Sequence, residues 1–509
     1  MKMKAPLRRG LAALCALLAP AGCQAAPELA VVGDSVKVKE GADLPRRSAL
    51  YAGGRVRLRA ARGETLGVQV LLTHAVRGAI ALDLHAKDVH IVAFRLDTVP
   101  VREPSTSMYG DSRGPGQYPD VLTPAPGGIE GQPRAYFDVA VGPAASPGRH
   151  TGELRIGSRR IPVELRIENA RIDLRSDPLV WVYYMPGEVA AVHGLPDDDR
   201  PEQIEVEREY YELFRRHGAL LAPHLGPHRF PPRRQFMKDV RFWPAWVDHS
   251  SDANIAADVR RWLELLDGSD VRAFSIPIDE PRTAEQRERV RHVAEVIGKA
   301  GGGRPSFLRA VTDAVHPVYG DSIDLYFSPL NIPEPANERR ARGQLFWTYN
   351  GKPPHAGSMI IDTYGVALRT WGWIGYLYDV DLWYAWEGLY FRDRYNRGAE
   401  ATDLLNDPVS FDERQKGGTD FGNGDGLLAY PGALPSLRLK ALRRGLQDRL
   451  LLEQLEDCGQ AAYARRVARA LIPRALGEAT GERAWPVHEA PWEEARHLVL
   501  DGIERHCPP

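Results

Sequence analysis

The chain has 509 residues, of which 43% are hydrophobic and 26% charged, and these values are ordinary for a soluble globular protein. Its formal net charge of −1 argues against a nucleic-acid-binding protein, which normally carries a basic excess. The four cysteines form no CxxC pair, so zinc-ribbon and thioredoxin-like motifs are excluded. The sequence also contains no HExxH and no GxxxxGK(S/T) motif. At about 100–200 residues per domain, the length predicts two to four domains.

Residues 1–26 are typical of an export signal. A basic start formed by Lys2, Lys4, Arg8 and Arg9 precedes an apolar stretch at 11–19, which is too short for a permanent membrane span. Two endings compete: Gly22-Cys23 resembles a lipobox that would place a lipid on Cys23, and ordinary cleavage would fall near Ala25 or Ala26. Either ending predicts an exported protein, namely a periplasmic or outer-envelope lipoprotein or a secreted protein, with membrane contact only through that lipid.

Residues 27–175 have the pattern of short strands. Ile161, Val163, Leu165 and Ile167 occupy every second position, which buries one face of a strand and leaves the other in water. Segments 55–59 and 67–72 repeat the pattern, and turn clusters such as Pro147-Gly148-Arg149 separate the strands. Short strands with regular turns and no helical stretch predict a β-sandwich domain.

Residues 176–435 alternate apolar strand candidates with amphipathic helical stretches. The strand candidates lie at 179–185, 219–224, 271–278, 306–312, 323–328, 344–349 and 381–390, and the helical stretches at 202–216, 255–266 and 283–300. Apolar strands separated by helices imply a parallel sheet, and seven or eight units in about 220 residues predict a (β/α)8 barrel. A missing strand or an extended loop is expected at 236–246.

Residues 436–509 are predicted to be a helical segment packed against the barrel, because leucines from 437 to 451 recur at helical spacing and 461–471 and 493–505 are further helices. Cys458 and Cys507 lie in this segment. In an oxidising compartment they can form a disulfide, and the alternative is two free, buried thiols.

The sharpest candidate for chemistry is the pair Asp279 and Glu280, which ends an apolar strand just before Pro281. A barrel carries its active site at the carboxyl ends of its strands, and paired carboxylates in a partly apolar pocket can divide the roles of acid and base. The alternative is that these acidic residues only open the following helix, whose N-terminus favours negative charge.

Aromatic side chains occupy other predicted strand ends. The candidates for substrate binding are Trp181, Tyr183, His224, Trp347, Tyr349, Trp383 and Trp386. Aromatic rings can stack on sugar C–H faces while their polar atoms bind hydroxyls. For any single residue of this set, packing inside the barrel is the competing interpretation.

The glycine-rich stretch from Gly417 to Gly426 contains Asp420, Asn423 and Asp425, whose oxygens suit calcium. It lacks the EF-hand spacing and the terminal Glu, so a tight-turn loop is favoured. No metal site and no cofactor are predicted.

Several blocks of the sequence resemble one family. They are Ile278-Asp279-Glu280-Pro281; Phe346-Trp347-Thr348-Tyr349 with Pro353-Pro354; Ile361-Asp362-Thr363; Arg369-Thr370-Trp371; the run from Gly424 to Gly432; Pro435-Ser436-Leu437-Arg438-Leu439; the run from Arg443 to Asp448; Arg62-Gly63-Glu64; Tyr118-Pro119-Asp120-Val121-Leu122; and the run from Pro147 to Gly152. Together they resemble the glycoside hydrolase family 123 type, whose catalytic domain is also catalogued as domain of unknown function 4091, over nearly the whole mature chain.

The resemblance implies a β-sandwich ahead of a (β/α)8 barrel and retaining β-N-acetylgalactosaminidase chemistry without a metal. In that chemistry the substrate's 2-acetamido oxygen attacks the anomeric carbon. By position, Glu280 would be the acid/base and would stay protonated, and Asp279 would stay ionised and orient the acetamido group. The last strand, 381–386, departs from the family's pattern.

The expected partner is an oligosaccharide or a glycoconjugate, and no nucleic acid. Two other functions stay open: a glycosidase of another specificity on the same frame, and a non-catalytic carbohydrate-binding envelope protein. The oligomeric state is not predicted.

Overall fold

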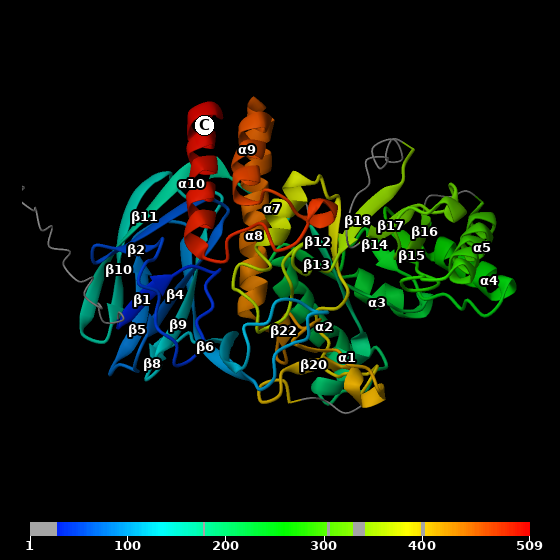
Figure 1. Ribbon diagram of the computed structural model, residues 1–509, viewed down its shortest axis with the longest axis horizontal. Coiled ribbons are helices and arrows are strands. Elements are labelled where there is room, and N and C mark those ends of the chain that lie inside the picture. The colour runs from blue at the N-terminus through cyan, green and yellow to red at the C-terminus, as the bar shows by residue number, and fades with distance from the viewer. Residues whose placement is uncertain (1–27, 177–178, 303–305, 329–341, 399–402, 509) are drawn as a thin grey trace, which may run out of the picture.

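The computed structural model describes residues 28–176, 179–302, 306–328, 342–398 and 403–508 (Figure 1). Its N-terminal part holds two sheets in the described residues. The first has the order β1 (Leu29–Val32), β4 (Thr65–Leu72), β9 (Arg134–Val141), β6 (Val89–Val101) and β7 (Gly116–Pro124). The second has the order β2 (Tyr51–Ala52), β3 (Arg55–Arg62), β11 (Arg159–Arg171), β10 (Gly148–Ile156), β5 (Ala79–Leu84) and β8 (Ile129–Glu130).

One hydrophobic cluster takes side chains from both N-terminal sheets. Val68 and Phe137 come from the first sheet, and Leu58 and Leu165 come from the second. The alternation predicted for β11 is confirmed, since Ile161, Val163, Leu165 and Ile167 are all buried. The predicted strands at 55–59 and 67–72 are β3 and β4.

The middle of the described chain forms an eight-stranded parallel sheet that is nearly closed into a barrel. Its order is β13 (Ala219–Pro223), β12 (Val180–Tyr184), β19 (Leu382–Ala385), β18 (Leu345–Tyr349), β17 (Leu325–Ser328), β16 (Phe307–Val311), β15 (Arg272–Ser275) and β14 (Phe242–Pro244). An isolated parallel bridge between Leu225 and Ala245 joins the two ends of this order. The strand missing from the sequence pattern is β14, within the expected stretch 236–246.

In the described residues, helices follow β12, β13, β14, β15 and β18, as the alternating pattern predicted, whereas β16 is followed by a short 3-10 turn at Pro317–Tyr319. They are α1 (Pro186–Val192), α2 (Pro201–Arg215), α3 (Phe230–Arg234), α4 (Asp252–Leu265), α5 (Ala284–Gly301) and α7 (Thr370–Leu377). After β19 come two short hairpins, β20 (Val409–Asp412) with β21 (Phe421–Asn423) and β22 (Ala429–Tyr430) with β23 (Leu434–Pro435). No described helix is long and apolar enough to cross a membrane.

The C-terminal helices are α8 (Leu437–Leu455), α9 (Ala461–Leu471) and α10 (Glu489–His506). Figure 1 shows α8 between the N-terminal sheets and the barrel, so it packs on both rather than on the barrel alone. Its buried basic residues pair with acidic residues of the N-terminal sheets and their connections: Arg438 with Asp120 at 2.8 Å, Arg443 with Asp138 at 2.5 Å and Arg444 with Glu64 at 2.6 Å.

Cys458 and Cys507 form a disulfide that joins the α8–α9 connection to the end of α10, which confirms the bonded alternative. The bond closes a loop with a sequence separation of 49. Replacing both cysteines with serine should lower the free energy of unfolding by about 2–4 kcal/mol, because the unfolded chain regains the entropy of the open loop. Chemical denaturation measures the loss. The control is wild-type protein under reductant, which should have the same unfolding midpoint as the double variant. Coincident unfolding curves for the oxidised wild type and the double variant would contradict the prediction.

Candidate active site

A cavity of about 230 Å³ lies at the carboxyl ends of the barrel strands. Trp181 and Tyr183 of β12, His224 after β13, Asp279 after β15 and Tyr384 of β19 are among the side chains that line it. This end of a barrel is where active sites form, because the loops that follow the strands converge there.

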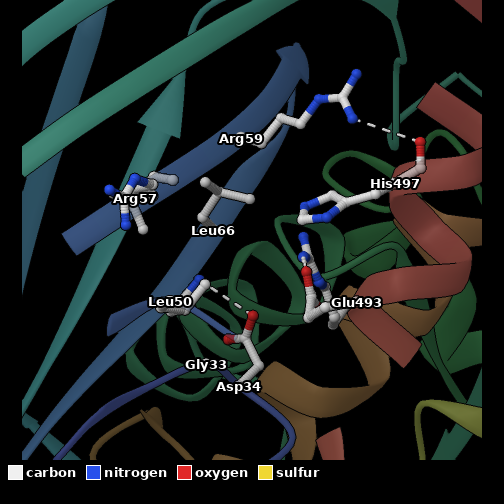
Figure 2. A pocket seen from close by; sticks show the side chains of 11 residues that line it. Gly33, Asp34, Leu50, Arg57, Arg59, Leu66, Glu493 and His497 are labelled. Carbon is white, nitrogen blue, oxygen red and sulfur yellow. Dashed lines mark hydrogen bonds and ion pairs between the residues drawn. The ribbon is translucent and has the colours of Figure 1, made fainter. Parts of the chain in front are cut away.

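Another hollow lies between α10 and the two N-terminal sheets and is lined by Asp34, Arg59, Glu493 and His497 among others (Figure 2). Its volume is about 20 Å³, which is room for one water molecule and not for a sugar. The barrel cavity is the candidate active site because it lies at the carboxyl ends of the strands and is lined by Asp279.

Asp279 and Glu280 lie just beyond the end of β15, where four hydrogen bonds hold them. Thr312 Oγ1 donates to Asp279 Oδ1 at 2.8 Å and accepts from the Glu280 backbone N–H at 2.6 Å. Tyr349 Oη donates to Glu280 Oε1 at 2.6 Å, and the exposed Arg282 reaches Glu280 Oε2 at 3.2 Å. Glu280 has a φ of 44°, which is rare for a residue with a side chain and is found at functional sites.

The helix-opening interpretation of the pair does not match the local geometry. Helix α5 begins at Ala284, and Thr283 caps it in a capping box with Gln286. The acidic residue in its first turn is Glu285, so Asp279 and Glu280 lie ahead of the helix rather than in it.

Asp279 keeps solvent exposure, but partial desolvation raises its pKa, the Thr312 hydrogen bond lowers it, and the charge of Glu280 raises it further. The family resemblance implies a protonated Glu280 and an ionised Asp279, whereas in the structure the pKa that is raised is that of Asp279. Desolvation, followed by the hydrogen bond to Glu280, raises the pKa of Tyr349, so its hydroxyl stays a donor.

Four of the aromatic candidates line the cavity: Trp181, Tyr183, His224 and Trp386. Burial lowers the pKa of His224 to about 4, so its ring is neutral near pH 7. The Trp386 indole N–H donates to Asp425 at 2.9 Å, which fixes the ring.

The other three candidates are placed differently. Tyr349 reaches Glu280 and does not itself line the cavity. Trp347 is buried deeper in the barrel, with its ring 6.3 Å from that of Trp181. Trp383 is buried outside the barrel, stacked 4.8 Å from Trp371 of α7. Neighbours along a strand point to opposite faces, so Tyr384 faces inward where Trp383 faces outward.

Sequence reasoning missed Thr312, Tyr384, Arg394 and Tyr395. Strand alternation is a signal that could have found Tyr384, whose ring lies 5.1 Å from that of Trp181. Arg394 lines the cavity and pairs at 2.8 Å with the buried Glu387, whose pKa burial raises to about 7. No sequence pattern indicates that the segment after β19 folds back over the cavity.

The glycine-rich loop forms the β20–β21 hairpin, as the turn interpretation predicted, and Gly417 takes a φ of 82° there. Among the described residues, no group of three or more His, Cys, Asp or Glu side chains is arranged to hold a metal ion. Near the end of this stretch, Asp425 is buried and accepts the Trp386 N–H.

Burial raises the pKa of Asp425 to about 7, so the folded state binds its proton more tightly than the unfolded chain does. The contribution of Asp425 to stability should be largest below about pH 4 and should fall, by up to about 4 kcal/mol, as the pH rises to about 7. Asp425→Asn, which keeps an acceptor for Trp386, should remove this loss. The measurement is the difference in unfolding free energy between variant and wild type from pH 4 to 8; a constant difference would contradict it.

No protein-family model matches the sequence, and no curated protein matches it. Among solved structures, the fold is similar to that of a family 123 glycoside hydrolase from Clostridium perfringens, with a TM-score of 0.65, 12% identity and coverage of 94% of this chain and 97% of that one. A glycosyl hydrolase family 2 member from Bacteroides cellulosilyticus has a TM-score of 0.25 and 11% identity over 76% of this chain and 49% of that one, too weak to carry an argument. The similarity to the Clostridium perfringens structure shows that the two chains share a fold.

Proposed function

We propose that this protein is a glycoside hydrolase in which Asp279 and Glu280 act on an oligosaccharide or glycoconjugate held in the barrel cavity. The observation that carries the proposal is the pair of adjacent carboxyl groups at the end of β15, beside a cavity lined with aromatic rings. The fold likeness supports it. The two N-terminal sheets then form a β-sandwich domain at 27–175, with the catalytic barrel at 176–435 and the helical segment at 436–509.

The finer proposal is retaining β-N-acetylhexosaminidase activity, favouring the galacto configuration. Glu280 protonates the leaving oxygen as the glycosidic bond breaks, and the substrate's acetamido oxygen forms the new bond to the anomeric carbon. Glu280 then takes a proton from the water that opens the resulting ring, so the configuration is retained. Tyr349 donates to Glu280 Oε1 and the exposed Arg282 reaches Oε2, so in this mechanism the Arg282 contact opens when Oε2 carries the transferable proton.

Asp279 has a complementary role in this mechanism. Its Oδ1 accepts the Thr312 hydroxyl, which leaves Oδ2 for the substrate's acetamido N–H. When the ionised Asp279 accepts the acetamido N–H, electron density on the amide oxygen increases, and this oxygen becomes a better nucleophile. Tyr384 also lines the cavity, and its hydroxyl is a candidate donor to the sugar.

The test is turnover of aryl glycosides by the full chain. An aryl β-N-acetylgalactosaminide should be cleaved and the matching 2-hydroxy galactoside should not, because only the former carries the internal nucleophile. Cleavage of both sugars would favour a glycosidase of another specificity. Binding without turnover across a broad glycan panel would favour a non-catalytic carbohydrate-binding protein, and the Asp279→Asn, Glu280→Gln double variant is the background control.

We also propose export, on the basis of the basic and apolar pattern of residues 1–26. Mass spectrometry of protein from its native envelope should find a chain that starts at lipid-modified Cys23 or near Ala26. A chain that keeps Met1 in the cytosol would contradict the proposal.

A further inference from the structure

One hydroxyl group contacts both members of the carboxyl pair. Thr312 directly follows β16, the strand beside β15, and parallel neighbours end at the same edge of a barrel. Its Oγ1 lies 2.6 Å from the Glu280 backbone nitrogen and 2.8 Å from Asp279 Oδ1. The side chain is 5% exposed, so water competes little for either bond.

The direction of these two bonds follows from chemistry. A backbone N–H can only donate, so Thr312 Oγ1 must accept from Glu280. A threonine hydroxyl has one hydrogen, and the remaining partner is Asp279 Oδ1. The hydroxyl hydrogen therefore points at Asp279, and this bond is strongest when Asp279 is an ionised acceptor.

The same hydroxyl also holds the backbone turn at Glu280. A residue with a side chain pays a steric cost at a φ of 44°, and such conformations persist only where surrounding contacts hold them. Within a regular strand, Asp279 and Glu280 would point to opposite faces. The turn instead allows Asp279 to line the cavity while Glu280 meets Tyr349 from β18.

We propose that Thr312 is a positioning residue for the reaction: its single hydroxyl keeps Asp279 an acceptor for substrate and fixes the turn that places Glu280 beside it. This inference rests on the proposed function. Thr312 contacts no substrate in this role and acts through the two carboxyl groups.

The expected effect on pH dependence follows from the groups that surround Asp279. These are Glu280 and Arg282 on its own segment, Tyr349 on β18, Tyr384 on β19, and His224 and Arg394 around the same cavity. Since the Thr312 bond lowers the pKa of Asp279, removing the hydroxyl should raise it. A rate that needs ionised Asp279 then declines at a higher pH, so the acid limb of the pH–rate profile moves upward.

The experiment compares Thr312→Val, Thr312→Ser and wild type in the full chain. Thr312→Val should lower kcat by about 10²-fold with a smaller change in KM, as for a misplaced reacting group, and should move the acid limb to higher pH. Thr312→Ser keeps the hydroxyl, so its kcat and its acid limb should stay close to those of the wild type. The matched control is Thr370→Val: Thr370 is buried, accepts from the Gly357 N–H at 2.9 Å and donates to Ala367 O at 2.6 Å, away from the cavity. It should leave the acid limb in place.

A second measurement separates this inference from the proposed function. The ¹³C signal of the Asp279 carboxyl, assigned by its loss in Asp279→Asn, should titrate at higher pH in Thr312→Val than in wild type or Thr312→Ser. If no glycoside is cleaved by wild type, the proposed function fails and this titration still tests the contact. An unshifted titration in Thr312→Val, or equal behaviour of Thr312→Ser and Thr312→Val, would overturn the inference.

Discussion

Replacing Glu280 with Gln is expected to lower kcat by about 10²–10⁴-fold on a glycoside with a poor leaving group. Such a substrate needs a proton on its leaving oxygen, and glutamine keeps the shape of the side chain but cannot transfer one. Activated aryl glycosides leave without that proton, so their cleavage should fall much less. Steady-state kinetics on a matched pair of substrates measures the difference.

Asp279→Asn is expected to slow both kinds of substrate, because it weakens the acetamido nucleophile and not the proton transfer. Glu285→Gln is the matched control, since Glu285 is an exposed carboxylate in the first turn of α5 and should leave both rates unchanged. Wild-type rates in a folded Asp279→Ala, Glu280→Ala double variant would remove the pair from the mechanism.

The second large effect is expected at Glu493, in the buried charge cluster where α10 meets α7, α8 and the N-terminal sheets. Glu493 accepts from Arg369 at 2.8 Å and from Arg444 at 2.8 Å, with all three side chains nearly inaccessible. Glu493→Gln removes a negative charge that these two buried guanidinium groups share, and water cannot replace it there. The expected loss in the free energy of unfolding is about 5 kcal/mol, the upper end for breaking a buried ion pair, because two cations are affected.

The pH dependence of that loss has a definite sign. Burial alone would raise the pKa of Glu493, but the charges of Arg444, Arg369 and Arg496 outweigh it and hold the pKa well below its ordinary value. A carboxyl group with a lowered folded-state pKa stabilises the fold above its unfolded pKa of about 4.3, and the contribution is lost as the pH falls. The difference between wild type and Glu493→Gln should therefore be full at pH 7 and shrink below about pH 4.

Urea unfolding from pH 3 to 8 measures this difference. The next residue offers a matched control, because Glu494 is exposed on the same helix, so Glu494→Gln should change stability little. Equal stability of Glu493→Gln and Glu494→Gln at pH 7 would contradict the expected role of the cluster.

Elements with a regular hydrophobic pattern could be predicted from the amino-acid sequence alone. The alternation at 161–167 shows which face of β11 is buried, and the apolar runs of the barrel and the leucine spacing of α8 indicate the type of element; the structure has a strand or helix at each place. Asp279 and Glu280 were found from the apolar stretch that precedes them, although β15 ends at Ser275 and not at Ile278 as the sequence predicted.

Contacts between residues that are distant in the sequence could be seen only in the tertiary structure. Whether Trp347, Trp383 or Tyr384 faces the cavity depends on which face of its strand points into the barrel. The short β14 exists because β15 pairs with it. Arg438 and Arg444 are buried in α8 only because Asp120 and Glu64 meet them from the N-terminal part of the chain, and Thr312 reaches both carboxyl groups only because β16 lies beside β15. A single charged or hydroxyl side chain does not belong to a repeating hydrophobic pattern. Its burial and its partner are therefore set only when distant segments of the chain pack together.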